Sequence, residues 1–309
     1  MTPVEEFEQL RPLLFSIAYR ILGSVAEAED AVQDSWLRFD ATRAAGTTIA
    51  SPKAFLSAVV TRISIDVLRS ARVQRERYVG QWLPEPLLTD PYQDPARVTE
   101  LADSLSMAAL LLLERLSPLE RAVFVLREVF GFEFAEIATT VDRSEAACRQ
   151  LAARARRHMD AGRPRFDTDR NEREALASRF FDALRGGDVE GLRELLAADV
   201  QMTWDTGGTV AQAPGGFVGV KRVVGMLALT IPELLRLGVG FEPHDVNGHP
   251  GAVVRDGGSR VLGTMTLEIL GGRVQTIRSV VNPDKLGHLG PVANSSPLLR
   301  AAHAARHSS

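Results

Sequence analysis

The stretch FEFAEIATTVDRSEAACRQLAARARR, Phe132 to Arg157, decides how the helical part of this chain is interpreted. Apolar residues recur at helical spacing in its first half and predict a short helix that buries one face. They are Phe134, Ile137, Ala138 and Val141. Asp142-Arg143-Ser144 then predicts a turn whose serine caps a second helix from Glu145 onward. This order of elements predicts a helix-turn-helix.

The second of these helices has the residues that DNA contact requires. Its first turn should direct Glu145, Ala146 and Arg149 outward, where a recognition helix meets base edges. Basic residues further along suit phosphate contacts. The predicted DNA-contacting residues of this block are Arg143, Ser144, Glu145, Arg149 and Arg154. The alternative is an ordinary surface helical hairpin with a solvated basic face.

The N-terminal part of the chain predicts two further helices. A helical pattern from Phe7 to Phe39 is interrupted at Gly23-Ser24, where Ser24 should cap the second helix. Acidic residues precede the apolar anchors of that helix, and they are Glu27, Glu29, Asp30 and Asp34. The helix dipole explains acids in a first turn, but it explains Asp34 less well.

A third predicted helix, Pro52 to about Arg77, has the opposite charge. It holds five arginines and two acids, whereas the first forty residues hold three arginines and eight acids. An acidic helix beside a basic one indicates two partners of opposite charge.

These blocks resemble a known family. AEDAVQDSWLRF followed by SPKAFLSAVVTRISIDVLRSAR resembles the promoter-opening domain of extracytoplasmic-function sigma factors. LSPLERAVFVLREVFGFEFAEIATTVDRSEAACRQLAARARR resembles their second, helix-turn-helix domain. The resemblance implies a factor that directs core RNA polymerase to promoters. A transcription regulator that binds duplex DNA without polymerase is the first alternative.

The resemblance also implies roles for individual residues. Glu27, Asp30 and Asp34 would dock on the beta-prime and beta subunits of core polymerase. The −10 element would be held by residues of the basic helix, namely Arg62, Asp66, Arg69 and Arg72. The loop from Arg43 to Ser51 would accept an extruded base, and the helix-turn-helix would read the −35 element.

Composition limits the other classes of protein. The 309 residues are 45% hydrophobic with a net charge of −3, which is enough for packed cores and argues against a general nucleic-acid coat. No stretch has the roughly 18 unbroken apolar residues of a membrane span, and the N-terminus lacks a signal-peptide pattern, so we expect a cytoplasmic protein. Cys148 is the single cysteine and is expected to be a buried packing residue. No cofactor and no metal site are predicted.

The segment Gln81 to Thr99 separates the two helical blocks. Prolines at 84, 86, 91 and 95 exclude a continuous helix and favour an extended chain. The segment nevertheless opens with apolar residues that need cover from water, namely Trp82, Leu83, Pro84, Leu87 and Leu88. Docking on the adjacent helices and docking on another domain are both open at this point.

After Arg170 the pattern changes to an α+β domain. Helices are predicted for Glu174–Leu184, Asp188–Leu196 and Phe217–Leu229. Strands are predicted for Leu237–Phe241, Ala252–Arg255, Arg260–Leu270 and Arg273–Val281. Helices followed by an antiparallel sheet resemble the SnoaL-like branch of the NTF2-like cone fold.

The predicted fold class is therefore multidomain, with two all-α sigma domains followed by an α+β NTF2-like domain. The expected ranges are 1–78 for the first helical domain, 79–104 for a proline-rich linker and 105–160 for the helix-turn-helix domain. The α+β domain is expected over 171–289, with a flexible tail over 290–309.

Three motifs match a subgroup of the family that carries such a C-terminal domain. Its WLPEP motif stands here as Trp82, Leu83, Pro84, Glu85 and Pro86, and its NPDKL motif as Asn282, Pro283, Asp284, Lys285 and Leu286. Its DGGGK motif is present only in part, as Asp205, Gly207 and Gly208, with departures at Thr206 and Thr209. The resemblance implies a regulatory domain, and we predict that it acts through contacts made by these motifs.

A catalytic role for this domain is the second alternative. An isomerase of this fold needs an acid or base and a donor facing the developing oxyanion. All three tyrosines precede the domain, and the candidate acids and bases are Asp199, Asp205, His244 and Asp245. Turn chemistry accounts for Asp199 and Asp205 without catalysis. His244 and Asp245 are adjacent in the sequence, and the side chains of neighbours in a strand point to opposite faces. We therefore predict regulation rather than catalysis, with a small-molecule ligand as an open alternative.

Overall fold

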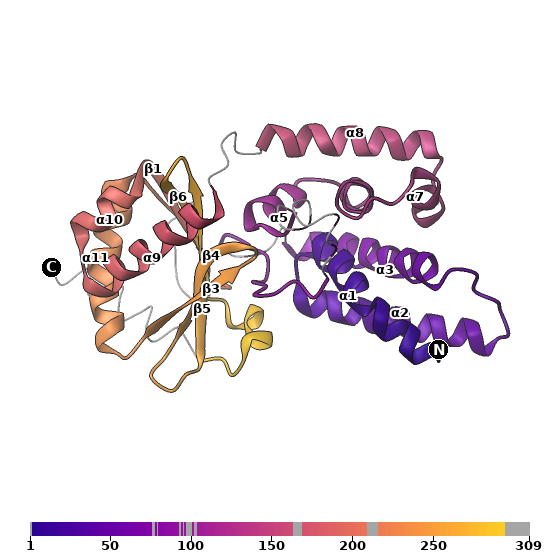
Figure 1. Cartoon of the computed structure of the whole chain (residues 1–309), viewed down its shortest axis with the longest axis horizontal. Coiled ribbons are helices and arrows are strands. Elements are labelled where there is room, and N and C mark those ends of the chain that lie inside the picture. The colour runs from indigo at the N-terminus through magenta and orange to yellow at the C-terminus, as the bar shows by residue number, and fades with distance from the viewer. Residues whose placement is uncertain are drawn as a thin grey trace. The chain divides into compact units, whose positions relative to one another are not determined.

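The computed structural model describes residues 2–75, 78, 80–92, 94, 96, 101, 104–162, 169–208 and 216–293, of which 71–75 and 162 are described by their backbone alone. The chain forms two compact units (Figure 1). The helical unit comprises Met1–Arg77 and Asp90–Arg163, and the C-terminal unit comprises Tyr78–Thr89 and Pro164–Ser309. The segment predicted as a linker, 79–104, is thus divided between the two units.

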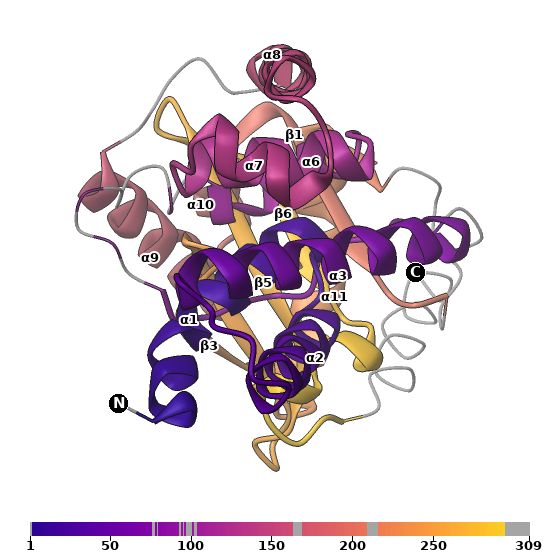
Figure 2. The same cartoon turned by 90° about the vertical axis from the view of Figure 1, so that its right-hand side faces the viewer.

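The helical unit begins with three helices that lie side by side, α1 (Pro3–Leu22), α2 (Val25–Ala44) and α3 (Pro52–Arg75) (Figure 2). Gly23 ends α1 in the left-handed conformation, at φ 72°. The Ser24 hydroxyl then accepts a hydrogen bond of 3.1 Å from the Glu27 N–H and caps α2. The predicted break and cap are confirmed.

The second part of this unit contains the helix-turn-helix. It consists of α5 (Met107–Leu113), α6 (Pro118–Phe124), the π-helical turn η2 (Val125–Val129), α7 (Phe134–Val141) and α8 (Glu145–Gly162). Asp142 reverses the chain after α7 at φ 53°, and the Ser144 hydroxyl accepts from the Ala147 N–H at 3.2 Å. Ile137 and Val141 are buried, as the pattern predicts.

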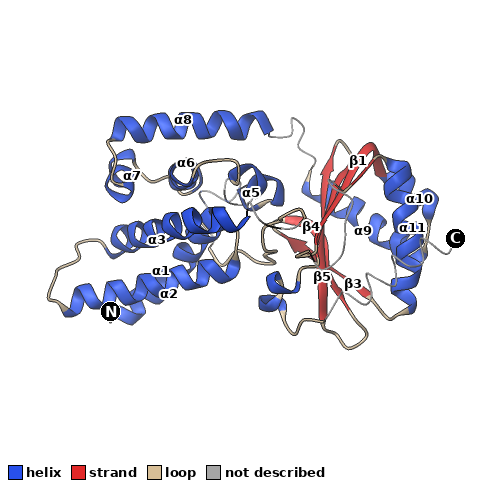
Figure 3. Cartoon of the chain, turned by 180° about the vertical axis from the view of Figure 1, so that it is seen from behind, coloured by secondary structure: helices blue, strands red, loops and turns tan. Residues whose placement is uncertain are grey.

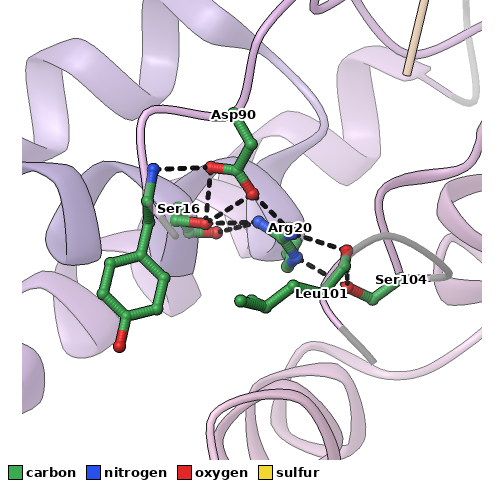
Figure 4. Close-up of polar contacts among 6 residues, drawn as sticks. Ser16, Arg20, Asp90, Leu101 and Ser104 are labelled. Atoms are coloured by element: carbon green, nitrogen blue, oxygen red, sulfur yellow. Dashed lines mark hydrogen bonds and ion pairs between the residues drawn. The ribbon is translucent and has the colours of Figure 1, made fainter. Parts of the chain in front are cut away.

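Two buried arginines join these parts of the helical unit, and Figure 4 shows the contacts of the first, Arg20. The Arg20 guanidinium on α1 donates to the Asp90 carboxylate, to the Ser104 hydroxyl and to the Leu101 carbonyl, each at 2.8 Å. Arg121 on α6 donates to the Arg20 carbonyl at 2.9 Å. Buried charges are tolerated when they are paired and hydrogen-bonded, so this network holds α1, α6 and the segment before α5 in one unit.

The C-terminal unit is built on one six-stranded sheet in the order β2-β1-β6-β5-β4-β3. The strands are β1 (Leu196–Asp205), β2 (Phe217–Val218), β3 (Gly240–Val246), β4 (His249–Arg255), β5 (Val261–Leu270) and β6 (Arg273–Val280). β1 and β6 are parallel, and the other neighbours are antiparallel. The predicted α+β class is confirmed.

Three helices, α9 (Arg170–Gly186), α10 (Val189–Leu195) and α11 (Val220–Arg236), lie on one face of this sheet (Figure 3). A hydrophobic cluster fills the space between them, including Phe180, Phe181, Met226, Met265 and Ile277. The described helices and strands of this unit begin at Arg170 or later, and the sequence pattern missed two of the strands, β1 and β2.

One predicted helix is wrong at its start. Phe217 and Val218 form the short strand β2, and the helix begins only at Val220 and runs on to Arg236. Gly219 separates the two elements at φ 92°, a conformation that glycine adopts without steric cost. The predicted strand over 237–241 likewise begins later, at Gly240, because Leu237 caps α11.

The chain after β6 forms two short 3₁₀ turns, η3 (Pro283–Lys285) and η4 (Gly287–Leu289). Part of the predicted tail is ordered, because Val261 on β5 donates to the Pro291 carbonyl and accepts from the Ala293 N–H, both at 2.8 Å. The rest of that tail, 294–309, lies outside the described residues. None of the described helices has the length and apolar character that crossing a membrane requires.

Candidate functional site

The predicted recognition helix presents its first turn to solvent. Glu145, Ala146 and Arg149 are exposed, and the Arg149 side chain keeps 57% of its accessible surface. The Arg149 guanidinium pairs with the Glu145 carboxylate one turn earlier, at 2.5 Å. Arg143 and Ser144 are also exposed, at the turn before the helix. Arg154 is exposed as well and lies 3.4 Å from Glu120, so all five predicted contact residues of this block are accessible.

Cys148 faces the opposite side of this helix and is fully buried. Burial raises the pKa of the Cys148 thiol, and the nearby Glu145 carboxylate adds to the increase. The thiolate is therefore scarcer in the folded protein than in the unfolded chain at any pH below the raised value. The packing role that the sequence predicts agrees with this environment.

Alkylation tests this assignment. At pH 8, we expect native Cys148 to react with iodoacetamide at least about tenfold more slowly than Cys148 of the urea-unfolded chain, because burial removes both access and thiolate. Mass spectrometry of timed samples gives both rates. Equal rates would contradict a buried thiol.

The acidic helix α2 exposes two of its predicted docking residues. Asp30 and Asp34 are exposed and lie one turn apart, whereas Ala31 and Ser35 are buried on the other side. Glu27 is only partly exposed and its amide is part of the Ser24 cap. A groove of about 450 Å³ lies between α1 and α2 beside this surface. It is lined by Val4, Phe7, Glu8, Arg11, Glu29, Val32, Gln33 and Trp36.

The basic helix α3 holds an unexpected contact. The Arg62 guanidinium donates to the Thr140 and Thr139 carbonyls at the end of α7, both at 2.7 Å. The last carbonyls of a helix lack partners within that helix, so they are good acceptors. Asp66 and Arg69 are exposed and pair at 3.2 Å, and the Arg72 side chain lies outside the described residues. Of the predicted −10 group, Arg62 is thus engaged with the helix-turn-helix.

The C-terminal unit contains a buried polar site around Asp205, the last residue of β1. The Asp205 carboxylate accepts hydrogen bonds from the Leu83 N–H at 2.9 Å and from the Gly207 N–H at 3.0 Å. It also accepts from the Tyr78 hydroxyl and pairs with the Lys285 ammonium at 2.7 Å. A fully buried carboxylate needs such partners, because its desolvation is costly otherwise.

Lys285 and Asn282 complete this site. The Lys285 ammonium donates to the Leu83 carbonyl at 2.5 Å and lies 4.2 Å from the centre of the Trp82 ring, close enough for a cation–π interaction. The Asn282 amide donates to the Tyr78 oxygen at 2.9 Å. Burial raises the pKa of Tyr78, and the hydrogen bond to Asp205 raises it further, so the phenol stays protonated. We call Tyr78, Leu83, Asp205, Asn282 and Lys285 the linker network.

Two further contacts hold the same segment. The Leu87 N–H donates to the Asn247 side chain at 3.1 Å, and the Asn247 N–H donates to the Leu87 carbonyl at 2.7 Å. The His288 ring lies 2.6 Å from the Pro86 carbonyl. Leu83 and Leu87 are buried. The sequence left open whether this apolar segment packs on the adjacent helices or on another domain. In the structure it packs within the C-terminal unit.

The linker network brings together residues from all three sequence motifs. Gly207 packs against Asn282 so closely that a Cβ atom would lie 2.7 Å from the amide, and its φ of 63° also favours glycine. Glu85 is buried, whereas Gly208 and the Asp284 side chain are exposed. Lys285, and not Asp284, therefore reaches the segment.

The sequence did not predict three residues that bind this segment, namely Tyr78, Asn247 and His288. Only Asn247-Gly248 carries a sequence signal, as a hairpin turn.

The residues weighed as catalytic do not converge. Asp199 is exposed within β1, and His244 and Asp245 are exposed on β3, where Asp245 lies 3.2 Å from Arg170. Asp205 is occupied by the linker network. Throughout the described ranges, no group of three metal-ligating side chains lies together.

Comparison with known proteins agrees with this geometry. The Sigma-70 region 2 family model matches residues 7–73, and the Sigma-70 region 4 model matches residues 106–159. The ECF RNA polymerase sigma factor SigJ of Mycobacterium tuberculosis is 38% identical over 299 residues, which cover 91% of this chain and 92% of SigJ. The chain belongs to the extracytoplasmic-function sigma factors of RNA polymerase.

Two further comparisons describe this sigma factor. A probable ECF sigma factor of Mycobacterium tuberculosis, SigI, is 32% identical over 285 residues, covering 90% of this chain and 93% of SigI. The crystal structure of Mycobacterium tuberculosis SigJ superposes with a TM-score of 0.70 at 36% identity and covers 92% of this chain and 98% of that one. The similarity therefore extends through the C-terminal unit of the sigma factor.

Proposed function

We propose that this sigma factor recruits core RNA polymerase through α2, opens the −10 element with α3 and reads the −35 element with α8. We further propose that the C-terminal unit modulates these steps. The observation that carries the second part is the linker network, through which the C-terminal unit binds the segment between the two helical blocks. We do not propose catalysis, because Asp199, His244 and Asp245 are exposed and the linker network occupies Asp205.

Polymerase docking is supported by the surface of α2. Asp30 and Asp34 present two carboxylates on one exposed face, next to the groove that contains Trp36. An acidic surface steers association with a basic partner, and the adjacent apolar groove adds contact area. Leu37 on the same helix is 58% exposed, which also suits a protein interface.

Promoter binding requires a change within the helical unit. By their positions, the −10 and −35 elements lie about 25 base pairs apart, which is about 85 Å along B-form DNA. The 2.7 Å contact between Arg62 and Thr140 keeps α3 beside α7. We infer that this contact opens when the factor binds promoter DNA, and that Arg62 then exchanges two carbonyl acceptors for DNA.

The C-terminal unit is suited to control this opening. The chain enters that unit at Tyr78 and returns to the helical unit at Asp90, whose carboxylate pairs with the buried Arg20. This segment connects the two helical blocks. Its hydrogen bonds with Asp205, Lys285 and Asn247 hold it on the C-terminal unit. Contacts within one chain benefit from a high effective concentration, so a small interface is sufficient.

Two arginines on α8 provide a test of DNA reading. We expect Arg149→Ala to cost about 1–3 kcal/mol and to relax the preference at one −35 position, because Arg149 lies in the first turn of the recognition helix. Arg154→Ala should weaken binding to all sequences alike and reduce the salt dependence. Binding of the polymerase holoenzyme to single-base promoter variants at several salt concentrations measures both. Equal, sequence-independent losses would contradict base reading by Arg149.

A second experiment tests regulation by the C-terminal unit. Asn247→Gly removes the acceptor of the Leu87 N–H while tolerating the φ of 53°, and His288→Ala removes the contact to Pro86. In run-off transcription with core polymerase, we expect both full-length variants to shift activity in the same direction by at least about twofold, the equivalent of losing one weak hydrogen bond.

The matched control for this experiment is Ser259→Gly. Ser259 also has a positive φ, 63°, but lies at the exposed hairpin between β4 and β5. It should leave transcription unchanged. Wild-type activity of Asn247→Gly and His288→Ala on several promoters would contradict regulation through the linker segment.

A further inference from the structure

Two arginine side chains lie over the aromatic ring of Phe134, the first residue of α7. The Arg149 guanidinium carbon lies 5.2 Å from the ring centre, and that of Arg127 lies 4.8 Å from it. Both distances are within the range of cation–π interactions. Phe134 is partly buried, so it is anchored in the helix-turn-helix while part of the ring is open to these cations.

Each arginine is also held at its charged end. Arg149 donates to Glu145 at 2.5 Å, and Arg127 donates to the Phe132 carbonyl at 2.9 Å and lies 3.2 Å from Glu133. Each cation therefore has its own carboxylate, which reduces the repulsion between the two guanidinium groups over one ring. The ring of Phe134 and the carboxylate of Glu145 together restrict the Arg149 side chain from two directions.

Such restriction matters for base reading. A free arginine side chain carries about 2 kcal/mol of rotamer entropy, part of which is lost when its fork binds a base edge. A side chain that is already oriented in the free protein loses less, and preorganisation raises affinity for that reason. A planar guanidinium over an aromatic ring also keeps its donor edge available for hydrogen bonds.

We propose that Phe134 is a positioning residue that orients Arg149 for reading the −35 element, and that Arg127 shares the same ring as part of this arrangement. The inference rests on the proposed base-reading role of Arg149. Phe134 lies on the first helix of the motif and does not need to touch DNA. Specificity at one base position would then depend on a residue outside the recognition helix.

The test uses full-length protein with core polymerase and a set of promoters that differ at single −35 positions. Phe134→Leu keeps apolar bulk but removes the ring, and Phe134→Tyr keeps the ring. We expect Phe134→Leu to reduce the preference at the position read by Arg149 by about two- to fivefold, the range of an exposed cation–π contact, without changing the salt slope. Phe134→Tyr should retain the wild-type preference, and Phe134→Leu in an Arg149→Ala background should add no further loss of preference.

The outcomes separate this inference from the proposed function. A position-specific loss for Arg149→Ala with none for Phe134→Leu would overturn the inference alone. A uniform loss for Arg149→Ala would overturn base reading and the inference with it. If Phe134→Leu lowers the melting temperature, Phe134→Met supplies a second ring-free variant. A loss that is equal at every promoter position for both ring-free variants would assign Phe134 a purely structural role.

Discussion

Asp205→Ala is expected to destabilise the C-terminal unit by about 3–5 kcal/mol, because it leaves the buried Lys285 ammonium without its carboxylate. The Leu83 and Gly207 N–H groups and the Tyr78 hydroxyl lose an acceptor at the same time. The segment around Trp82 should then leave the C-terminal unit. Denaturation by urea gives the stability, and hydrogen exchange of the peptide over 80–88 reports release of the segment.

Two further variants make this prediction specific. Asp199→Ala is the matched control, since Asp199 lies on the same strand but is exposed, and it should change stability by less than about 0.5 kcal/mol. Combining Asp205→Ala with Lys285→Met removes both charges, so the double variant should be less destabilised than the sum of the two single variants. Additive losses, or wild-type exchange over 80–88 in Asp205→Ala, would show that the network does not hold the segment.

Asp30→Lys with Asp34→Lys should lower the affinity for core RNA polymerase by at least about 100-fold, since like charges at an interface cost several kcal/mol. Both side chains are exposed on α2, so the melting temperature should remain that of the wild type. Binding to core polymerase is measured by fluorescence anisotropy at two salt concentrations. The effect should be greater at the lower salt, because screening weakens charge repulsion.

Asp40→Lys supplies the control for this experiment. Asp40 is exposed on the same helix, six residues after Asp34, and a helix turns by about 100° per residue, so it lies on a different face. The control makes one such charge reversal away from the docking face, the same change as each of the two substitutions in the double variant. Wild-type affinity of the double variant, equal to that of Asp40→Lys, would remove Asp30 and Asp34 from the polymerase interface.

The sequence was sufficient for the elements whose signals are local. The Gly23 break, the Ser24 and Ser144 caps and the short helix ending at Val141 follow from hydrogen bonds and backbone angles within a few residues. β1 escaped prediction because its exposed and buried residues do not alternate regularly from Leu196 onward. The Phe217–Leu229 pattern misled because strand and helix join there at Gly219 without a gap.

The candidate site likewise combines motifs that are visible in the sequence with contacts between residues far apart in the chain. WLPEP and NPDKL stand out in the sequence, and the apolar character of Trp82 and Leu83 shows that the first needs cover. The partners of these motifs are nearly all distant in the chain. Tyr78 meets Asp205 and Asn282 across more than 120 residues, and no periodicity encodes that encounter.

By itself, the sequence determined that this chain has two helical sigma blocks and an α+β domain, because periodicity, caps and motifs act over short distances. Only the tertiary structure decided that the C-terminal unit covers the apolar first part of the linker, that Lys285 rather than Asp284 reaches it, and that Arg62 is bound by the end of α7. The physical reason is that a buried charge selects its partner by three-dimensional proximity and desolvation, which depend on the packing of the whole chain.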